Sequence, residues 1–136
     1  MKTIHETETR LKDFHFEMLT WKSSLQFIEG EVQFINQLLN SYVFEPNTPN
    51  LFERLQEFKT QIKTVQTELE NIYLEISKQE SELGGMMECD TMSCDIFYSD
   101  KHYSLKEKFD LFYKNYQFFK TKVFSYAGGV LKKKKK

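Results

Sequence analysis

Apolar residues recur along this chain in alternating steps of three and four, and this spacing constrains the fold more than any other feature. Three such series run through the sequence. The first comprises Leu11, Phe14, Met18, Trp21, Leu25, Ile28, Val32, Ile35, Leu39 and Tyr42; the second Leu51, Leu55, Phe58, Ile62, Val65, Leu69, Ile72, Ile76, Gln79 and Leu83; the third Leu105, Phe109, Phe112, Tyr116, Phe119, Val123 and Tyr126. An average step of 3.5 residues places one apolar seam along a helix, facing its neighbours. The pattern therefore predicts an all-α protein of three helices.

The helix ends follow from capping and turn residues. Thr3 and Ser104 each precede a Glu by three positions, as in a capping box that starts a helix. Pro46 and Pro49 interrupt the first series, and Thr48 or Asn50 is placed to cap the second helix. We expect helices at about 3–44, 49–83 and 104–127, with Gly84-Gly85 ending the second helix in a left-handed conformation.

These boundaries predict one domain over residues 1–131: an antiparallel three-helix bundle with a long coiled-coil hairpin of helices 1 and 2. A loop at 84–103 and a basic segment at 132–136 complete the expected organisation. At 1.5 Å per residue the first two helices would be about 60 and 50 Å long, and the third only about 36 Å. A shorter third helix would leave the end of the hairpin near the prolines uncovered.

Some apolar residues fall outside the seams. Phe16, Phe27, Phe34 and Leu38 share another face of the first helix, and Leu111 and Phe118 lie off the seam of the third. Exposed apolar patches usually mark interfaces. We therefore expect binding of a protein partner or of a second copy through nine residues: Phe27, Phe34, Leu38, Tyr42, Phe44, Leu51, Phe52, Leu111 and Phe118.

Charge is divided unevenly along the chain. Residues 1–103 carry a net charge of −9 and residues 104–136 one of +8. This division favours a third helix that neutralises an acidic hairpin, followed by a solvated run Lys132–Lys136. In the alternative interpretation this run binds an anionic surface, RNA or membrane, together with Lys106, Lys108, Lys114, Lys120 and Lys122.

The expected loop at 84–103 contains the residues with the most chemistry. Cys89, Cys94 and His102 could respond to redox conditions or bind a soft metal ion, although a Cys-x4-Cys spacing without a second pair is a weak metal signature. The sequence has no apolar run long enough for a signal peptide or a membrane span. We therefore expect a cytoplasmic protein with reduced thiols and no bound metal or other cofactor, although the two cysteines could pair in an oxidising compartment.

Catalytic signatures are lacking. The three histidines are scattered, and the sequence contains neither a phosphate-binding glycine loop nor a nucleophile motif. The sequence thus favours a non-enzymatic helical interaction protein, an adaptor or subunit with no small-molecule substrate. An anionic-surface binder and a thiol- or metal-dependent protein are the alternatives.

Overall fold

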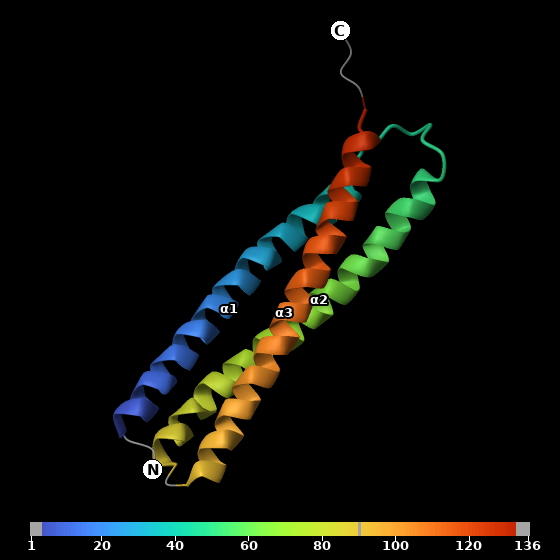
Figure 1. The fold of residues 1–136 in the computed structure, drawn as a ribbon. Helices are drawn as coiled ribbons and strands as arrows, with labels where there is room; N and C mark the ends of the chain where they lie inside the picture. Colours follow the sequence, from blue (N-terminus) through green and yellow to red (C-terminus); the bar gives the residue numbers. More distant parts are fainter. Residues whose placement is uncertain (1–3, 90, 133–136) are drawn as a thin grey trace.

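A computed structural model describes residues 4–89 and 91–132 of the chain. It contains three long helices, α1 (Ile4–Leu39), α2 (Leu51–Glu82) and α3 (Met92–Gly129), and a 3-10 helix, η1 (Leu83–Glu88), between α2 and α3. α1 and α3 run in one direction and α2 in the other (Figure 1). The predicted all-α class and antiparallel packing are confirmed. The β-structure of the described residues is limited to one isolated bridge, between Phe44 and Leu131.

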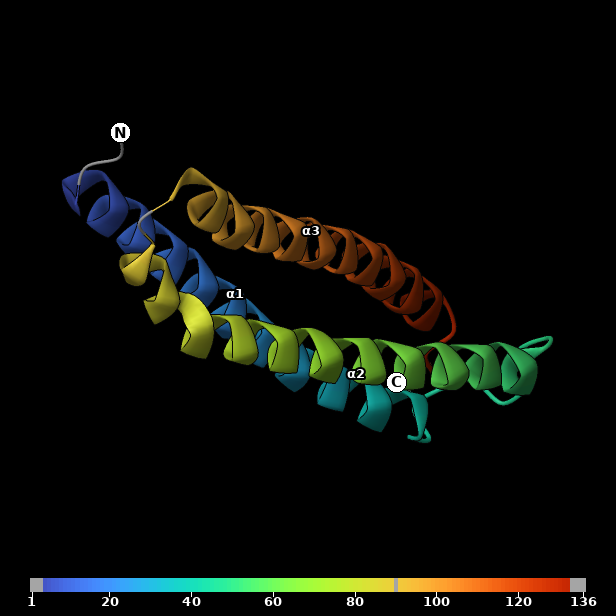
Figure 2. The same ribbon diagram turned by 90° about the horizontal axis from the view of Figure 1, so that it is seen from below.

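The three seams meet in one apolar core. α1 packs most extensively on α2, α2 packs next on α3, and α1 and α3 have the fewest close backbone contacts. Seen at right angles to the first view, α3 lies along one side of the α1–α2 pair (Figure 2). Large side chains that are fully buried include Met18, Leu25, Ile35, Ile62, Ile76, Tyr116 and Val123. None of the described helices contains an apolar stretch that could cross a lipid bilayer.

The expected loop at 84–103 and the short third helix are wrong. α3 begins at Met92 and has 38 residues, which makes it the longest of the described helices. Its N-cap is Thr91, whose side chain accepts a hydrogen bond of 3.1 Å from the Cys94 amide. The three–four pattern in fact continues backward from Leu105 through His102, Tyr98 and Asp95. Two of these positions, Asp95 and His102, are polar, so the apolar spacing did not reveal the first three turns of α3.

The ends of the first two helices also differ from expectation. α1 ends at Leu39 rather than near residue 44. Asn50 occupies the N-cap position of α2 but adopts the left-handed conformation, φ 57°, and its side chain forms no capping hydrogen bond. Gly84 and Gly85 lie within η1, and no described glycine has a positive φ. Gly85 has a steric role instead, because a Cβ there would clash with the Tyr98 hydroxyl.

The end of the bundle near the prolines is partly covered. Antiparallel backbone hydrogen bonds join residues 43–45 to residues 130–132: the Glu45 amide donates to the Val130 carbonyl and the Lys132 amide to the Val43 carbonyl, each at 2.8 Å. Figure 1 shows the end of α3 beside the α1–α2 connection. The expectation that this end lies beyond the reach of the third helix is therefore wrong.

Candidate functional site

A regular ladder of polar contacts sets the register between α1 and α3. Arg10 pairs with Asp95, Glu17 with His102 and Glu31 with Tyr116, and each pair is separated by 85 residues in sequence. The α1 positions are 7 and 14 residues apart, so the ladder follows the heptad spacing of both helices. These pairs define the register of α1 against α3. The register in turn determines which exposed residues of the two helices are neighbours.

Ion pairs hold the basic α3 against the acidic hairpin. Lys106 and Lys120 reach Glu17 and Glu31 on α1, at 3.9 and 3.0 Å, and both glutamates also belong to the ladder. On the other side, Lys101 and Lys108 reach Glu82 and Glu75 on α2, at 3.5 and 3.1 Å. Four cations of α3 are therefore engaged within the bundle, as the charge-neutralising interpretation predicts.

The candidate site is an apolar surface across the α1–α3 seam, which we call the phenylalanine face and define as Phe27, Phe34 and Phe124. Their side chains are 69%, 55% and 39% exposed. The rings of Phe34 and Phe124 lie 6.2 Å apart, centroid to centroid, so the surface is continuous between the two helices. Three aromatic side chains on adjacent helices present a large rigid apolar area to solvent.

A neutralised polar cluster lies within this face. Glu31, which precedes Phe34 by three residues and follows Phe27 by four, accepts hydrogen bonds from the Tyr116 hydroxyl at 3.1 Å and from Lys120 at 3.0 Å. Burial, and then the neighbouring Glu31 carboxylate, raise the pKa of Tyr116 above its ordinary value, so the phenol remains a neutral donor. The polar groups at the centre of the face therefore already have partners, and covering them leaves no isolated charge.

The nine residues expected to bind a partner do not form one surface. Phe27 and Phe34 belong to the phenylalanine face, whereas Phe118 lines a groove between α3 and α2 with Val65 and Gln61. Leu111 is 61% exposed on α3.

The other five members of that set lie near the α1–α2 connection. Tyr42 and Phe52 are exposed, and Leu51, like Leu38 at the end of α1, is half-buried. Phe44 is buried at 4% exposure, which contradicts its assignment as a partner-binding residue. It is buried because residues 43–45 pair with residues 130–132.

Sequence reasoning missed Phe124 as a member of the face. Phe124 follows Lys120 by four residues, so the two side chains lie on the same side of α3. Lys120 pairs with Glu31 of α1, so this side of α3 faces α1. The acid–base complementarity of Glu31 and Lys120 was a usable signal, but its use requires the register between α1 and α3. Several further apolar residues are exposed in the structure: Phe16, Leu74, Met92 and Phe97.

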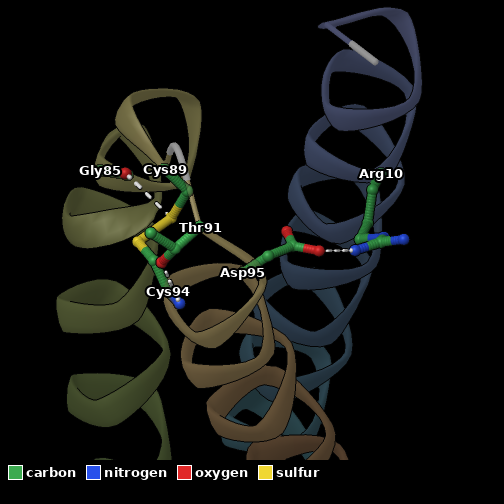
Figure 3. A network of polar contacts seen from close by, with 6 residues as sticks. All are labelled: Arg10, Gly85, Cys89, Thr91, Cys94 and Asp95. Atoms are coloured by element: carbon green, nitrogen blue, oxygen red, sulfur yellow. Dashed lines mark hydrogen bonds and ion pairs between the residues drawn. A yellow bond between two sulfur atoms is a disulfide. The ribbon is translucent and has the colours of Figure 1, made fainter. Parts of the chain in front are cut away.

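The two cysteines lie at the end of the bundle opposite the α1–α2 connection. They form a disulfide, with Cα atoms 5.5 Å apart. The expectation of reduced thiols is therefore wrong in this structure. The chain reverses between η1 and α3, and the Thr91 cap starts the new helix close to Cys89 (Figure 3). This reversal brings the sulfur atoms together. The Arg10–Asp95 pair lies alongside and fastens the same end of α3 to α1.

His102 is not part of a ligand set with the cysteines. Its ring is fully buried, stacks on Phe14 at 3.8 Å between centroids and lies 5.0 Å from Trp21. Nε2 lies 3.2 Å from a Glu17 carboxylate oxygen, and Nδ1 has no hydrogen-bond partner among the described residues. Burial lowers the pKa of His102, and the Glu17 contact only partly offsets this shift. The histidine is therefore a core residue.

No metal-binding cluster is assembled where the structure describes the chain: no group of three or more His, Cys, Asp or Glu side chains is placed to hold an ion. The combination of Cys89, Cys94 and His102 considered from the sequence is separated into a disulfide and a core histidine.

Comparison of the chain with protein-family models, with curated proteins and with solved structures finds no match.

Proposed function

We propose that this protein is a non-enzymatic helical interaction protein that binds an apolar helix, of a partner or of a second copy, on its phenylalanine face. The observation that carries the proposal is the exposure of Phe27, Phe34 and Phe124 around the neutralised Glu31–Lys120 pair. Binding energy at interfaces is concentrated in a few central aromatic anchors surrounded by contacts that exclude water.

The rigidity of the face supports the proposal. Its members lie in the middle and C-terminal parts of α1 and α3, whose relative height is fixed by the polar ladder. Helix-borne side chains lose little backbone entropy when a partner docks, in contrast to side chains on loops. A partner helix placed along the α1–α3 seam would contact all three rings and bury a surface that water now covers.

Glutamate substitution in the face tests the proposal. Phe27→Glu and Phe34→Glu should each weaken association by at least about tenfold, because a charge replaces an apolar anchor. Leu74→Glu on α2 is the matched control: Leu74 is 66% exposed, close to the 69% of Phe27, but lies on a different helix. Light scattering over a concentration series measures self-association, and quantitative capture from cell extract measures partner binding.

Two results would contradict the proposal. One is a wild-type protein that is monomeric throughout the series and captures the same proteins in the same amounts as Phe27→Glu. The other is an equal loss of association in Leu74→Glu, which would show that the effect depends on added charge and not on the face. Circular dichroism of each variant verifies that the bundle remains folded.

A further inference from the structure

The C-terminal ends of α1 and α3 share a composition that sets them apart from the rest of the chain. Residues 32–44 and 123–131 are the two longest stretches of the sequence without an Asp, Glu, Lys or Arg. The first stretch covers the end of α1 and the start of the α1–α2 connection, and the second covers the end of α3 and the two residues after it. They are far apart in the sequence, so only the fold decides whether they form one surface.

The structure places these two stretches side by side. The rings of Phe34 and Phe124 lie 6.2 Å apart, centroid to centroid, and an antiparallel bridge joins Phe44 to Leu131. Figure 1 shows the end of α3 beside the end of α1 and the connection that follows it. The two stretches therefore form one surface, which we call the uncharged strip. It continues the phenylalanine face along the α1–α3 seam toward the α1–α2 connection.

Each end of the uncharged strip is bounded by one acid and one lysine. At the end nearer the disulfide, Glu31 of α1 pairs with Lys120 of α3 at 3.0 Å. At the other end, Glu45 and Lys132 come directly after the two stretches, on chain segments that are joined by backbone hydrogen bonds of 2.8 Å. Opposite charges thus adjoin at both boundaries, so a strongly charged partner surface would find no complementary potential along the strip.

The side chains that the strip presents to solvent are aromatic, aliphatic or amide. Tyr42 is 90% exposed, Phe34 is 55% exposed, and Phe124 and Leu131 are 39% and 46% exposed. Gln37, three residues after Phe34 on the same side of α1, is exposed as well. The centre of a protein–protein interface has this composition, because charged residues are depleted there and aromatic residues are enriched.

Other exposed aromatic rings of the bundle belong to charged surfaces. The Lys101 ammonium lies 4.7 Å from the centroid of the Phe97 ring, and the Lys122 ammonium lies 4.5 Å from that of the Phe118 ring. Lys122 also lines the groove between α2 and α3 with Gln61, so it lies on the α2 side of α3 and outside the strip. The strip therefore differs from these surfaces in charge as well as in position.

We propose that the uncharged strip binds the same strip of a second copy, which makes the protein a two-fold symmetric dimer. This inference rests on the proposed function, because Phe34 and Phe124 belong to the phenylalanine face as well. A charged partner surface is disfavoured, since a charge buried against the strip would lack a counter-charge. The chain itself carries a matching uncharged surface, and a two-fold dimer uses one self-complementary patch on both subunits.

The positions of the exposed rings along α1 suit this symmetry. A two-fold axis at right angles to α1 near Phe34 sets Phe27 of each copy close to Tyr42 of the other, because Phe27 precedes Phe34 by seven residues and Tyr42 follows it by eight. Both side chains are more than half exposed in the single chain. The dimer would thus cover the most exposed ring of the strip and the most exposed ring of the phenylalanine face together.

Sedimentation velocity of the full chain tests the chemistry of the interface. It is measured over a concentration series at about 100 and about 500 mM sodium chloride. The expected result is a dimer whose dissociation constant changes by less than about twofold between the two salt concentrations, because the strip contributes no charge that salt could screen.

A matched pair of glutamine substitutions locates the interface. Gln37→Glu should weaken the dimer by at least about tenfold, because the two-fold symmetry buries the new carboxylate twice. Gln26→Glu is the control: Gln26 is also exposed on α1 but lines the groove toward α2 with Leu74, so its change should alter the dissociation constant by less than about threefold. Tyr42→Ser should weaken the dimer by at least about threefold. Circular dichroism verifies that each variant is folded.

Three results would overturn the inference: a wild type that is monomeric throughout the series, a dimer that dissociates when the salt concentration is raised, or an equal loss in Gln37→Glu and Gln26→Glu. A monomeric wild type that captures a partner protein, with capture lost in Phe27→Glu, would overturn the second copy and leave the proposed function standing. A monomeric wild type whose captured proteins are unchanged in Phe27→Glu would overturn both.

Discussion

At the disulfide end of the bundle, which we define as residues 79–89 and 91–102 with the facing part of α1, polar side chains are buried. His102 is fully buried, Asp95 is 8% exposed and pairs with Arg10, and Gln79 of α2 is 7% exposed. At the opposite end, which comprises residues 40–53 and 130–132 and which we call the turn end, the arrangement is inverted, because Tyr42 and Phe52 are apolar and exposed. Hydrophobicity alone therefore misassigns residues at both ends, in opposite directions.

The difference follows from the number of packed neighbours. At the disulfide end α1, α2, η1 and α3 are all present, so even polar seam positions are enclosed. At the turn end α1 stops at Leu39, and Tyr42, the next position of the seam, has no helix beneath it. A core position needs a partner as well as the right spacing.

The largest expected effect comes from removing an aromatic side chain of the disulfide end. Trp21→Ala should lower the free energy of unfolding by about 3–5 kcal/mol, because it leaves a cavity against His102 and Phe109. Phe44→Ala, at the turn end and outside the main core cluster, should cost about 2 kcal/mol. Urea denaturation measures both. Equal losses would show that the two ends are equally well packed.

Loss of the disulfide should have the next largest effect. A bridge between Cys89 and Cys94 closes a short loop, and the chain-entropy relation gives about 2 kcal/mol for a loop of this size. Reduction should lower the melting temperature of the wild type but not that of a Cys89→Ser, Cys94→Ser double variant. A wild type that is unaffected by reductant, with two free thiols by mass spectrometry, would contradict the pairing.

Acid sensitivity is a smaller expected difference between the two ends. The pKa of His102 is lowered by burial, so below about pH 6.5 the unfolded chain binds a proton more readily than the folded chain. Stability should therefore fall as the pH drops from about 7 toward 5.5. His102→Phe, which can keep the stacking on Phe14, should flatten this dependence in thermal unfolding.

The exposed His15, with 54% of its side chain in solvent, provides the control for acid sensitivity. His15→Gln, at a histidine outside the buried layer, should change the slope of melting temperature against pH less than His102→Phe does. If His15→Gln flattens the slope and His102→Phe does not, the acid sensitivity does not originate in the buried layer.

The smallest expected effect distinguishes the two sides of α3. The Glu31 and Lys120 side chains are each 22% exposed, whereas Glu75 and Lys108 are 46% and 58% exposed. Double-mutant cycles should give a coupling of about 0.5–1 kcal/mol for the first pair and about 0.2 kcal/mol for the second, since solvent screens the more exposed pair. A larger coupling for Glu75–Lys108 would contradict this order.

Much of the fold could be predicted because it depends on local patterns. The three–four spacing identified Met18, Leu25, Ile62 and Val123 as core residues, and all four are buried. The N-terminal part of α3 could not be predicted in the same way. Its seam positions 95 and 102 are polar, and they are tolerated because Arg10 and Glu17 of α1 supply their partners.

The sequence by itself determined that this chain forms three amphipathic helices, because the apolar spacing and the proline turn act within one segment at a time. Only the tertiary structure decided the register of α1 against α3, the burial of His102 and Phe44, and the neighbours of Phe34 and Lys132. These features depend on contacts between residues about 85 positions apart, as for Glu31 and Tyr116. No pattern within a single helix specifies such contacts, because a seam can slide by a heptad and still bury its apolar residues.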